Sequence, residues 1–233
     1  MKIVNCLAIY ITSAFAFGCT KNDSSVVNHD MTLSQSKEIN LLVEAHTNPD
    51  EVRRLAELGD AEAQYALGGY LQFSVEGKGG AAIREAVDWY RKAGDQNHSG
   101  ALKSLGDIFL FMDSWHDFIE PSPGRSHKEE ALECYRKSAL AGNFSSMHLV
   151  GGMYFKLSRD EENAEKRKAF AIESFAWEMA FLSASPSLLQ HEHGIPAEYI
   201  ENLKQEARDR LKPEHHSEAE ALAQNYIQSI VEK

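Results

Sequence analysis

Two pairs of histidines offer the side chains that are best suited to metal chemistry in this sequence. His191 and His193 are two residues apart, and His215 is followed directly by His216. Each pair supplies two imidazole ligands, whereas a protein zinc site uses three or four ligands at regular spacings. Neither pair has an obvious third ligand at a fixed spacing, and both lie in polar stretches near predicted loops. The pattern favours exposed loops over a metal site, and we expect no cofactor.

The other signs of catalysis are equally weak. Serine, histidine and acidic residues are present, but the sequence has no nucleophile elbow and no zinc-protease helix. The glycines at 77, 79 and 80 do not follow a predicted strand and lack the lysine–serine ending of a phosphate-binding loop. Cys134 occupies a packed position in a helical pattern, which favours a small core residue over a nucleophile. We therefore expect no enzyme; a hydrolytic enzyme with a convergent acid–histidine cleft is the outside alternative.

The elements that position these residues follow an internal repeat. Three ten-residue segments align, 59–68, 97–106 and 142–151, and each ends in an aliphatic residue followed by glycine. A second pattern follows each segment, with an aromatic four residues after a small residue: Ala86 and Tyr90, Ala131 and Tyr135, Ala171 and Phe175. Offsets of this size share one helical face. The repeat predicts a solenoid of helix pairs. The predicted pairs are 60–73 with 84–95, 99–112 with 128–141, and 144–157 with 166–184.

The two patterns together resemble a known family. The motif G-x-A-x-A-x-x-x-L-G of residues 59–68, followed by A-x-x-W-Y-x-K-A of residues 86–93, is similar to the Sel-one-like (Sel1-like) repeat, a relative of the tetratricopeptide repeat. The resemblance covers roughly residues 49–180. The third copy departs from it, with Ser174-Phe175 in place of Trp-Tyr. The resemblance implies an all-α, right-handed α-solenoid with a concave partner-binding face, and it implies no enzyme activity.

Shorter helical patterns flank the repeats. Residues 39–45 and 52–58 are predicted to form a leading pair, so the repeat region runs over 36–184. Residues 185–233 are predicted to form a C-terminal helical cap, with helices over 196–211 and 217–231, because a solenoid needs a polar outer face at its end. The sequence Ser217-x-x-Glu220 predicts a capping box at the start of the last helix.

The amino terminus indicates where the protein is located in the cell. Residues 1–18 begin with Met1-Lys2, and the uncharged stretch 3–18 is too short for a membrane span of about 20 residues, so we interpret residues 1–18 as a signal peptide. The sequence then places Cys19 before a polar stretch, which resembles a lipoprotein signal with Cys19 as the lipidated residue. By resemblance, the outer membrane facing the periplasm is the predicted location; ordinary secretion and an uncleaved anchor are the alternatives. Residues 19–35 are predicted to be a flexible tether.

The best local indication of a binding site is an insertion in the second repeat. From the repeat glycine to the next repeat alanine the chain takes 18 residues in the first unit (68 to 86) and 20 in the third (151 to 171), but 25 in the second (106 to 131). Long loops in compact repeats are often functional. The candidate partner-binding residues in this insertion are Phe111, Trp115, His116, Phe118 and Ile119. The alternative is that these apolar residues fold back over the core of the second unit.

Charge narrows the class of partner. The chain has 24 basic and 35 acidic residues, a net charge of −11. Removal of residues 1–18 would delete one basic residue and change the balance to −12. This balance argues against nucleic acid, which requires a basic surface, and is compatible with a basic protein. We expect a lipid-anchored interaction scaffold, with an immunity protein that neutralises a basic secreted effector as the sharper hypothesis. An envelope-assembly or signalling adaptor is the alternative.

Overall fold

The described part of the chain is built from α-helices. The structure is a computed structural model that describes residues 33–73, 80–111, 116–184 and 196–231, and no strand occurs among them. None of the helices in these ranges is long and apolar enough to cross a membrane. In chain order the α-helices are α2 (Leu33–Thr47), α3 (Pro49–Glu57), α4 (Ala61–Phe73), α5 (Gly80–Asp95), α6 (Ser99–Phe111), α7 (His127–Leu140), α8 (Phe144–Asp160), α9 (Ala164–Ala184), α10 (Ala197–Arg210) and α11 (His216–Val231), with a 3₁₀ turn, η4 (Pro213–His215), before the last.

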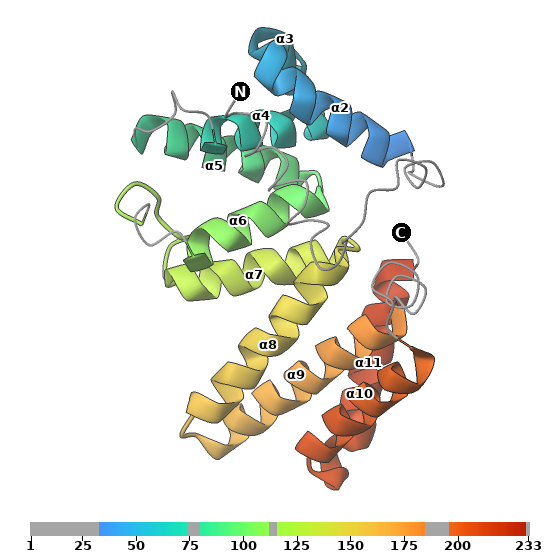
Figure 1. Cartoon of the computed structure of the whole chain (residues 1–233). Helices are drawn as coiled ribbons and strands as arrows, with labels where there is room; N and C mark the ends of the chain where they lie inside the picture. Colours follow the sequence, from blue (N-terminus) through green and yellow to red (C-terminus); the bar gives the residue numbers. More distant parts are fainter. Residues whose placement is uncertain (1–32, 74–79, 112–115, 185–195, 232–233) are drawn as a thin grey trace.

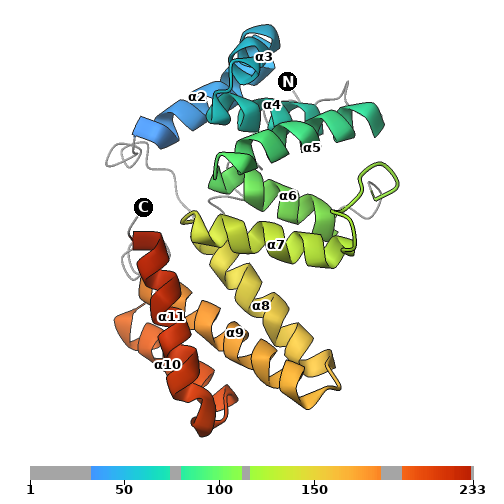
Figure 2. The same ribbon diagram turned by 180° about the vertical axis from the view of Figure 1, so that it is seen from behind.

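Successive helices stack in pairs, as the repeat predicts. Unit one is α4 with α5, unit two is α6 with α7, and unit three is α8 with α9, and each second helix packs on the first helix of the next unit. Figure 1 and the reverse view in Figure 2 show the first two units in parallel layers, with α8 and α9 turned steeply against them. The expected α-solenoid of helix pairs is therefore confirmed.

The turns that lead into the three units share one backbone conformation. Gly59, Asn97 and Gly142 occupy the same repeat position, and all three have positive φ angles, of 95°, 63° and 91°. A left-handed residue of this kind ends the preceding helix and satisfies its last carbonyl groups. Glycine fills this role at 59 and 142, and asparagine, which tolerates this conformation, replaces glycine in the middle turn.

The next residue caps the following helix in each unit. The backbone N–H of Ala63 donates to Oδ1 of Asp60 at 3.0 Å, and that of Ser146 donates to Oδ1 of Asn143 at 3.0 Å. In the middle unit, Ala101 N–H donates to Nδ1 of His98 at 3.1 Å. Each cap satisfies one of the free donors at a helix N-terminus. A residue pair at the turn thus both ends one helix and starts the next.

Close approach of the two helices in a unit depends on the repeat glycine. A Cβ atom built on Gly68 would lie 2.8 Å from the ring of Tyr90, and one built on Gly106 would lie 2.6 Å from the ring of Tyr135. Both tyrosines are buried. Unit three differs, because Gly151 lies against the backbone of α9 near Ser174, whose hydroxyl donates to the Gly151 carbonyl at 3.0 Å.

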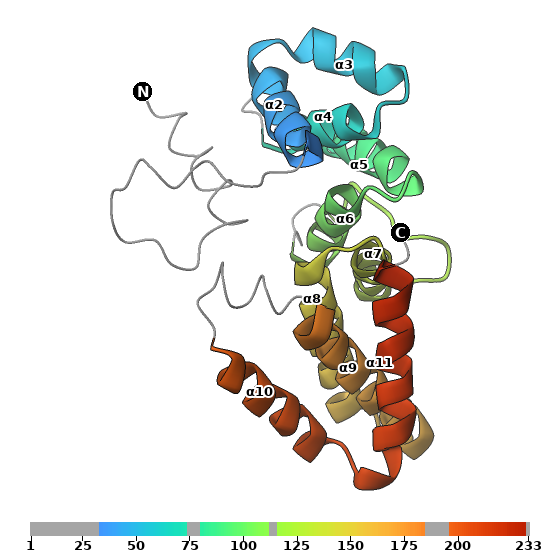
Figure 3. The same cartoon turned by 90° about the vertical axis from the view of Figure 1, so that its right-hand side faces the viewer.

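Helix α9 of the third unit packs both on the solenoid and on the C-terminal helices α10 and α11. Trp177 is fully buried in the main core, which runs through units one to three, and stacks on Tyr226 of α11 with 4.0 Å between ring centroids. Phe175 instead packs in a second core with residues of α10 and α11, including Ala207 and Ala223. Figure 3 shows α10 running away from the stack and α11 returning along α9. The two helices therefore cover the end of the solenoid.

Three predicted helix starts are wrong. Helix α2 begins at Leu33 rather than at residue 39, and its Lys37 forms a 2.6 Å ion pair with the N-cap residue Asp60. Helix α5 begins at Gly80 rather than at residue 84. The predicted capping box fails because η4 continues directly into α11 at His216, which leaves Ser217 inside the helix.

Candidate interaction site

The insertion of unit two joins α6 to α7. The structure describes its second part, residues 116–126, whereas Trp115 and residues 112–114 lie outside the described ranges. Phe111 is the last residue of α6, and its side chain is 62% exposed. The remaining candidates of the insertion are therefore placed by the segment that returns to α7.

Ile119 attaches this segment to the core. Its side chain is 4% exposed and belongs to the main hydrophobic core. On either side of it, Nε2 of His116 bonds to the carbonyl of Phe109 at 3.2 Å, and Nε2 of His127 bonds to the carbonyl of Ile119 at 3.2 Å. The two imidazole rings stack with 3.8 Å between centroids and 16° between planes. His116 and Ile119 thus hold the loop against α6 and α7.

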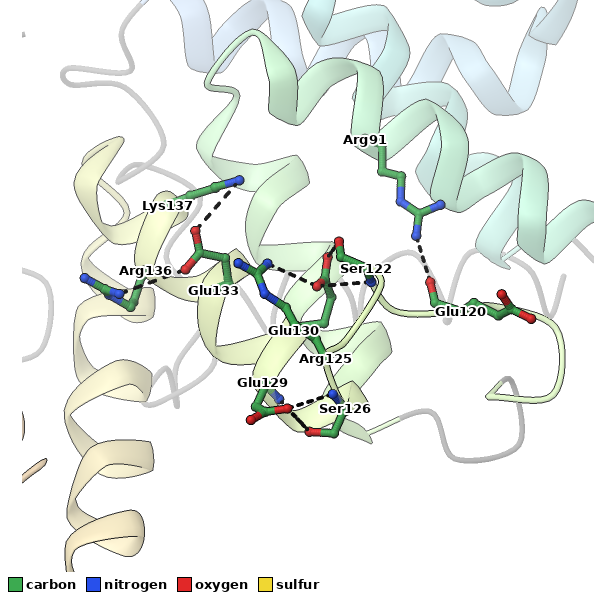
Figure 4. Close-up of polar contacts among 10 residues, drawn as sticks. All are labelled: Arg91, Glu120, Ser122, Arg125, Ser126, Glu129, Glu130, Glu133, Arg136 and Lys137. Atoms are coloured by element: carbon green, nitrogen blue, oxygen red, sulfur yellow. Dashed lines mark hydrogen bonds and ion pairs between the residues drawn. The ribbon is translucent and has the colours of Figure 1, made fainter. Parts of the chain in front are cut away.

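A buried carboxylate fixes the next part of the loop. Glu130 of α7 accepts hydrogen bonds from the hydroxyl of Ser122 at 2.8 Å, from the Ser122 N–H at 3.3 Å and from Nη1 of Arg125 at 3.3 Å (Figure 4). Partial burial opposes ionisation, but the hydrogen bonds from Ser122 and Arg125 outweigh it and lower the pKa of Glu130. An ionised, well-satisfied acceptor of this kind stabilises the loop conformation.

Two more contacts complete the set that holds the insertion in place, which we call the clamp. Arg91 of α5 donates from Nη2 to the carbonyl of Glu120 at 3.0 Å, which joins the insertion to the preceding unit (Figure 4). At the other end, Ser126 and Glu129 form a reciprocal capping box at the start of α7. The backbone from 119 to 126 is therefore held from α5 and from α7.

Phe118 is presented by this clamped segment. Its side chain is 40% exposed, and its inner edge lies against Gly80 at the start of α5, where a Cβ would have no room. Asp117 and Glu120 beside it are exposed. We call Phe111, Asp117, Phe118 and Glu120 the insertion surface. Phe111 lies at the end of α6, whereas Asp117, Phe118 and Glu120 lie on the segment that Ile119 and Arg91 hold in place. The surface thus contains two exposed aromatic rings and two carboxylates.

The sequence-predicted residues therefore divide into two groups. Phe111 and Phe118 are open to a partner, whereas His116 and Ile119 face the protein and hold the loop in place. Sequence reasoning missed Glu130, because a glutamate in the first turn of a helix is typical of an exposed position. The concave partner-binding face that the resemblance implies stays a prediction.

Two of the candidate chemical groups, His216 and Cys134, lie in structural surroundings. His216 donates from Nε2 to the backbone carbonyls of Arg208 and Leu211, at 3.0 and 2.9 Å, and stacks on Phe175. No cluster of three metal-ligating side chains occurs among the described residues. His191, His193 and Cys19 lie outside them. Cys134 is buried, and desolvation raises the pKa of its thiol to about 12.

Comparison with known proteins gives structural neighbours but no sequence relative. No family model matches the chain, and no curated protein matches it. One similar solved structure is a Sel1 repeat protein from Oxalobacter formigenes, with 14% identity, a TM-score of 0.43 and coverage of 99% of both chains. Another is a protective antigen of uropathogenic Escherichia coli with an SLR fold, with 16% identity and a TM-score of 0.41.

These neighbours have the type of repeat that the sequence motif resembles. In this chain the helix contacts themselves show an α-solenoid of stacked pairs. The alignment with the Escherichia coli antigen covers 84% of this chain but only 46% of the antigen, so this chain spans less than half of that protein. The site residues and any partner must be argued from the contacts described above, because the identities are too low to transfer a function.

Proposed function

We propose that this protein is an interaction scaffold that binds a protein partner through the insertion surface. The observation that carries the proposal is the pair of exposed rings, Phe111 and Phe118, at a loop that Glu130 and Ile119 hold in place. Aromatic anchors dominate the energy of many protein interfaces. A clamped loop binds with a smaller loss of conformational entropy than a mobile one.

The charge of the surface favours a basic partner. Asp117 and Glu120 flank Phe118 and are exposed, and the whole chain has a net charge of −11. Such a field attracts a cationic protein and increases its association rate. The same field repels nucleic acid, so we do not propose a nucleic-acid ligand.

We further propose that the chain is a lipoprotein anchored through Cys19 on the periplasmic side of the outer membrane. The support is the sequence alone: an uncharged stretch, a small residue before Cys19 and a polar stretch after it. Replacement of Cys19 by serine is expected to abolish palmitate labelling and to release the protein from the membrane fraction. Unchanged labelling would refute the anchor without affecting the scaffold.

The sharper form of the proposal is an immunity protein for a toxic secreted effector, and the alternative is an envelope-assembly or signalling adaptor. An acidic aromatic surface would suit the occlusion of a basic effector.

The chain should be used as bait in extracts of envelope and secreted fractions, with bound proteins identified by mass spectrometry. One dominant secreted hydrolase, whose toxicity the chain suppresses on co-expression, would support immunity. Several assembly components would support the adaptor. A catalytic activity of the purified chain would refute both.

A further inference from the structure

A second surface lies at the far end of the solenoid from the insertion, where α8, α9 and α10 meet. A recess of about 50 Å³ opens there, and Phe155 of α8 forms one side of it. Its apolar wall consists of Ala171 and Phe175 of α9 with Ala207 of α10 and its C-cap residue Leu211. Dry cavities of about 150 Å³ take up benzene, so this smaller recess suits a small aliphatic group better than an aromatic ring.

The hydroxyl groups in the recess already donate hydrogen bonds to backbone carbonyls. Ser158 donates to the carbonyl of Phe155 at 2.7 Å, and Ser174 donates to the carbonyl of Gly151 at 3.0 Å. Neither hydroxyl proton is therefore available to a ligand. The recess offers an apolar contact, and its polar recognition must come from the rim.

The rim is an exposed aromatic ring between two guanidinium groups. Phe155 is 39% exposed, and the guanidinium carbons of Arg159 and Arg210 lie 5.9 and 5.8 Å from its ring centroid. Glu178 holds Arg210 with two hydrogen bonds of 2.6 and 2.7 Å. Among the described residues Arg159 forms no ion pair, so its charge faces solvent.

The positive charge of this rim lies on its α8 side. Lys156 and Arg159 are exposed on the last turns of α8, with Asp160 as the one acid of that helix. Arg210 is paired with Glu178, so it adds no net charge to the recess. The α8 side of the rim therefore favours an acidic segment, and the net charge of −11 disfavours the binding of that segment elsewhere on the chain.

We propose that this recess, lined by Phe155 and flanked by Arg159, docks an acidic segment of a second protein. One small aliphatic side chain of that segment enters the recess, and a carboxylate beside it pairs with Arg159. Arginine and aromatic residues are the side chains most enriched in the energetic centres of interfaces. The surface is independent of the insertion surface and would allow the scaffold to hold two partners of opposite charge.

The test uses a fluorescein-labelled peptide of ten residues, built from glycine, serine and glutamate with one central valine. Its binding to the purified chain is followed by fluorescence anisotropy at low salt. Two further peptides carry tryptophan in place of the valine or lysine in place of the glutamates. We expect saturable binding of the valine peptide, weaker binding of the tryptophan peptide and no binding of the lysine peptide.

Variants of the chain separate the local site from long-range attraction. Arg159→Glu and Phe155→Ala should each weaken binding at least fivefold. Arg84→Glu makes the same charge change on an exposed residue of α5 and should change binding less than twofold. Circular dichroism checks that each variant is folded. Failure to saturate at millimolar protein, equal weakening by both charge reversals, or equal binding of the lysine peptide would each overturn the proposal. Variants of Phe111 and Phe118 should leave this binding unchanged, which separates its failure from that of the insertion surface.

Discussion

Gly106 of α6 lies against the ring of Tyr135 of α7 so closely that a Cβ atom on the glycine would come within 2.6 Å of the tyrosine Cε1. Tyr135 is fully buried, and its hydroxyl donates to Oδ1 of Asp107 at 2.7 Å, so the ring is fixed at both ends. The repeat glycine is therefore a packing requirement of the helix pair.

This packing predicts opposite effects for two glycine-to-alanine substitutions. Gly106→Ala should lower the free energy of unfolding by about 1 to 3 kcal/mol, because overpacking against Tyr135 outweighs the better helix propensity of alanine. Gly152→Ala should raise it by up to about 1 kcal/mol, because Gly152 is exposed in α8 and nothing lies within 4 Å of its Cβ position. Urea denaturation followed by circular dichroism measures both. Equal effects of the two substitutions would contradict this account of the helix contact.

The carboxylate of Glu130 predicts a pH-dependent contribution to stability. Despite partial burial, the hydrogen bonds from Ser122 and Arg125 lower its pKa in the folded chain. A carboxylate of this kind stabilises the fold above its unfolded pKa of about 4.3, and the contribution is lost as the pH falls through the folded pKa. Glu130→Gln should therefore reduce the free energy of unfolding by about 1 kcal/mol at pH 7. The difference from wild type should shrink below about pH 4.3.

Urea denaturation of wild type and Glu130→Gln between pH 7 and pH 3 tests this prediction. Glu57→Gln, at an exposed glutamate of α3, removes the same charge without a buried contact and serves as the control. The Glu130 clamp is wrong if the two variants lose the same stability at pH 7, or if the Glu130→Gln difference does not depend on pH.

The burial of Cys134 predicts a thiol that does not react in the folded chain. Desolvation raises the pKa of this thiol to about 12, so almost no thiolate is present at pH 8. In a chain with Cys6 and Cys19 replaced by alanine, Ellman's reagent should label Cys134 only at the rate of unfolding. In 6 M guanidinium chloride (roughly the range that unfolds even hyperstable domains) labelling should be rapid. Fast labelling of the native chain would show that the core of unit two opens readily.

The sequence was sufficient to predict the helix pairs because the repeat glycine, the small residue and the aromatic recur at fixed offsets. The same pattern predicts the third helix pair but not which side of α9 packs in which core. Phe175 and Trp177 are both apolar and two residues apart on α9, so they point to different sides of the helix, and only packing decides which side faces which core. The structure assigns Trp177 to the main core and Phe175 to the cap.

For the insertion, the length and the apolar residues are readable from the sequence, but their exposure is not. Ile119 and Phe118 are adjacent and similarly hydrophobic, yet the first is buried and the second is 40% exposed. The difference arises from long-range contacts, of which the hydrogen bond from Arg91 to the Glu120 carbonyl is an example. The guanidinium group of Arg91 binds the backbone carbonyl of a residue 29 positions later in the chain. No local sequence pattern predicts such a contact.

The most direct test of the central claim is the capture of the partner by a chain that lacks the two exposed rings of the insertion surface. The double variant Phe111→Ala, Phe118→Ala is compared with wild type and with Tyr199→Ala, which removes an exposed ring from α10. Captured protein is quantified by mass spectrometry, and the thermal transition of each variant is recorded. We expect at least a tenfold loss of capture for the double variant, a nearly unchanged thermal transition, and wild-type capture by Tyr199→Ala. Full capture by the double variant would show that the insertion surface does not bind the partner.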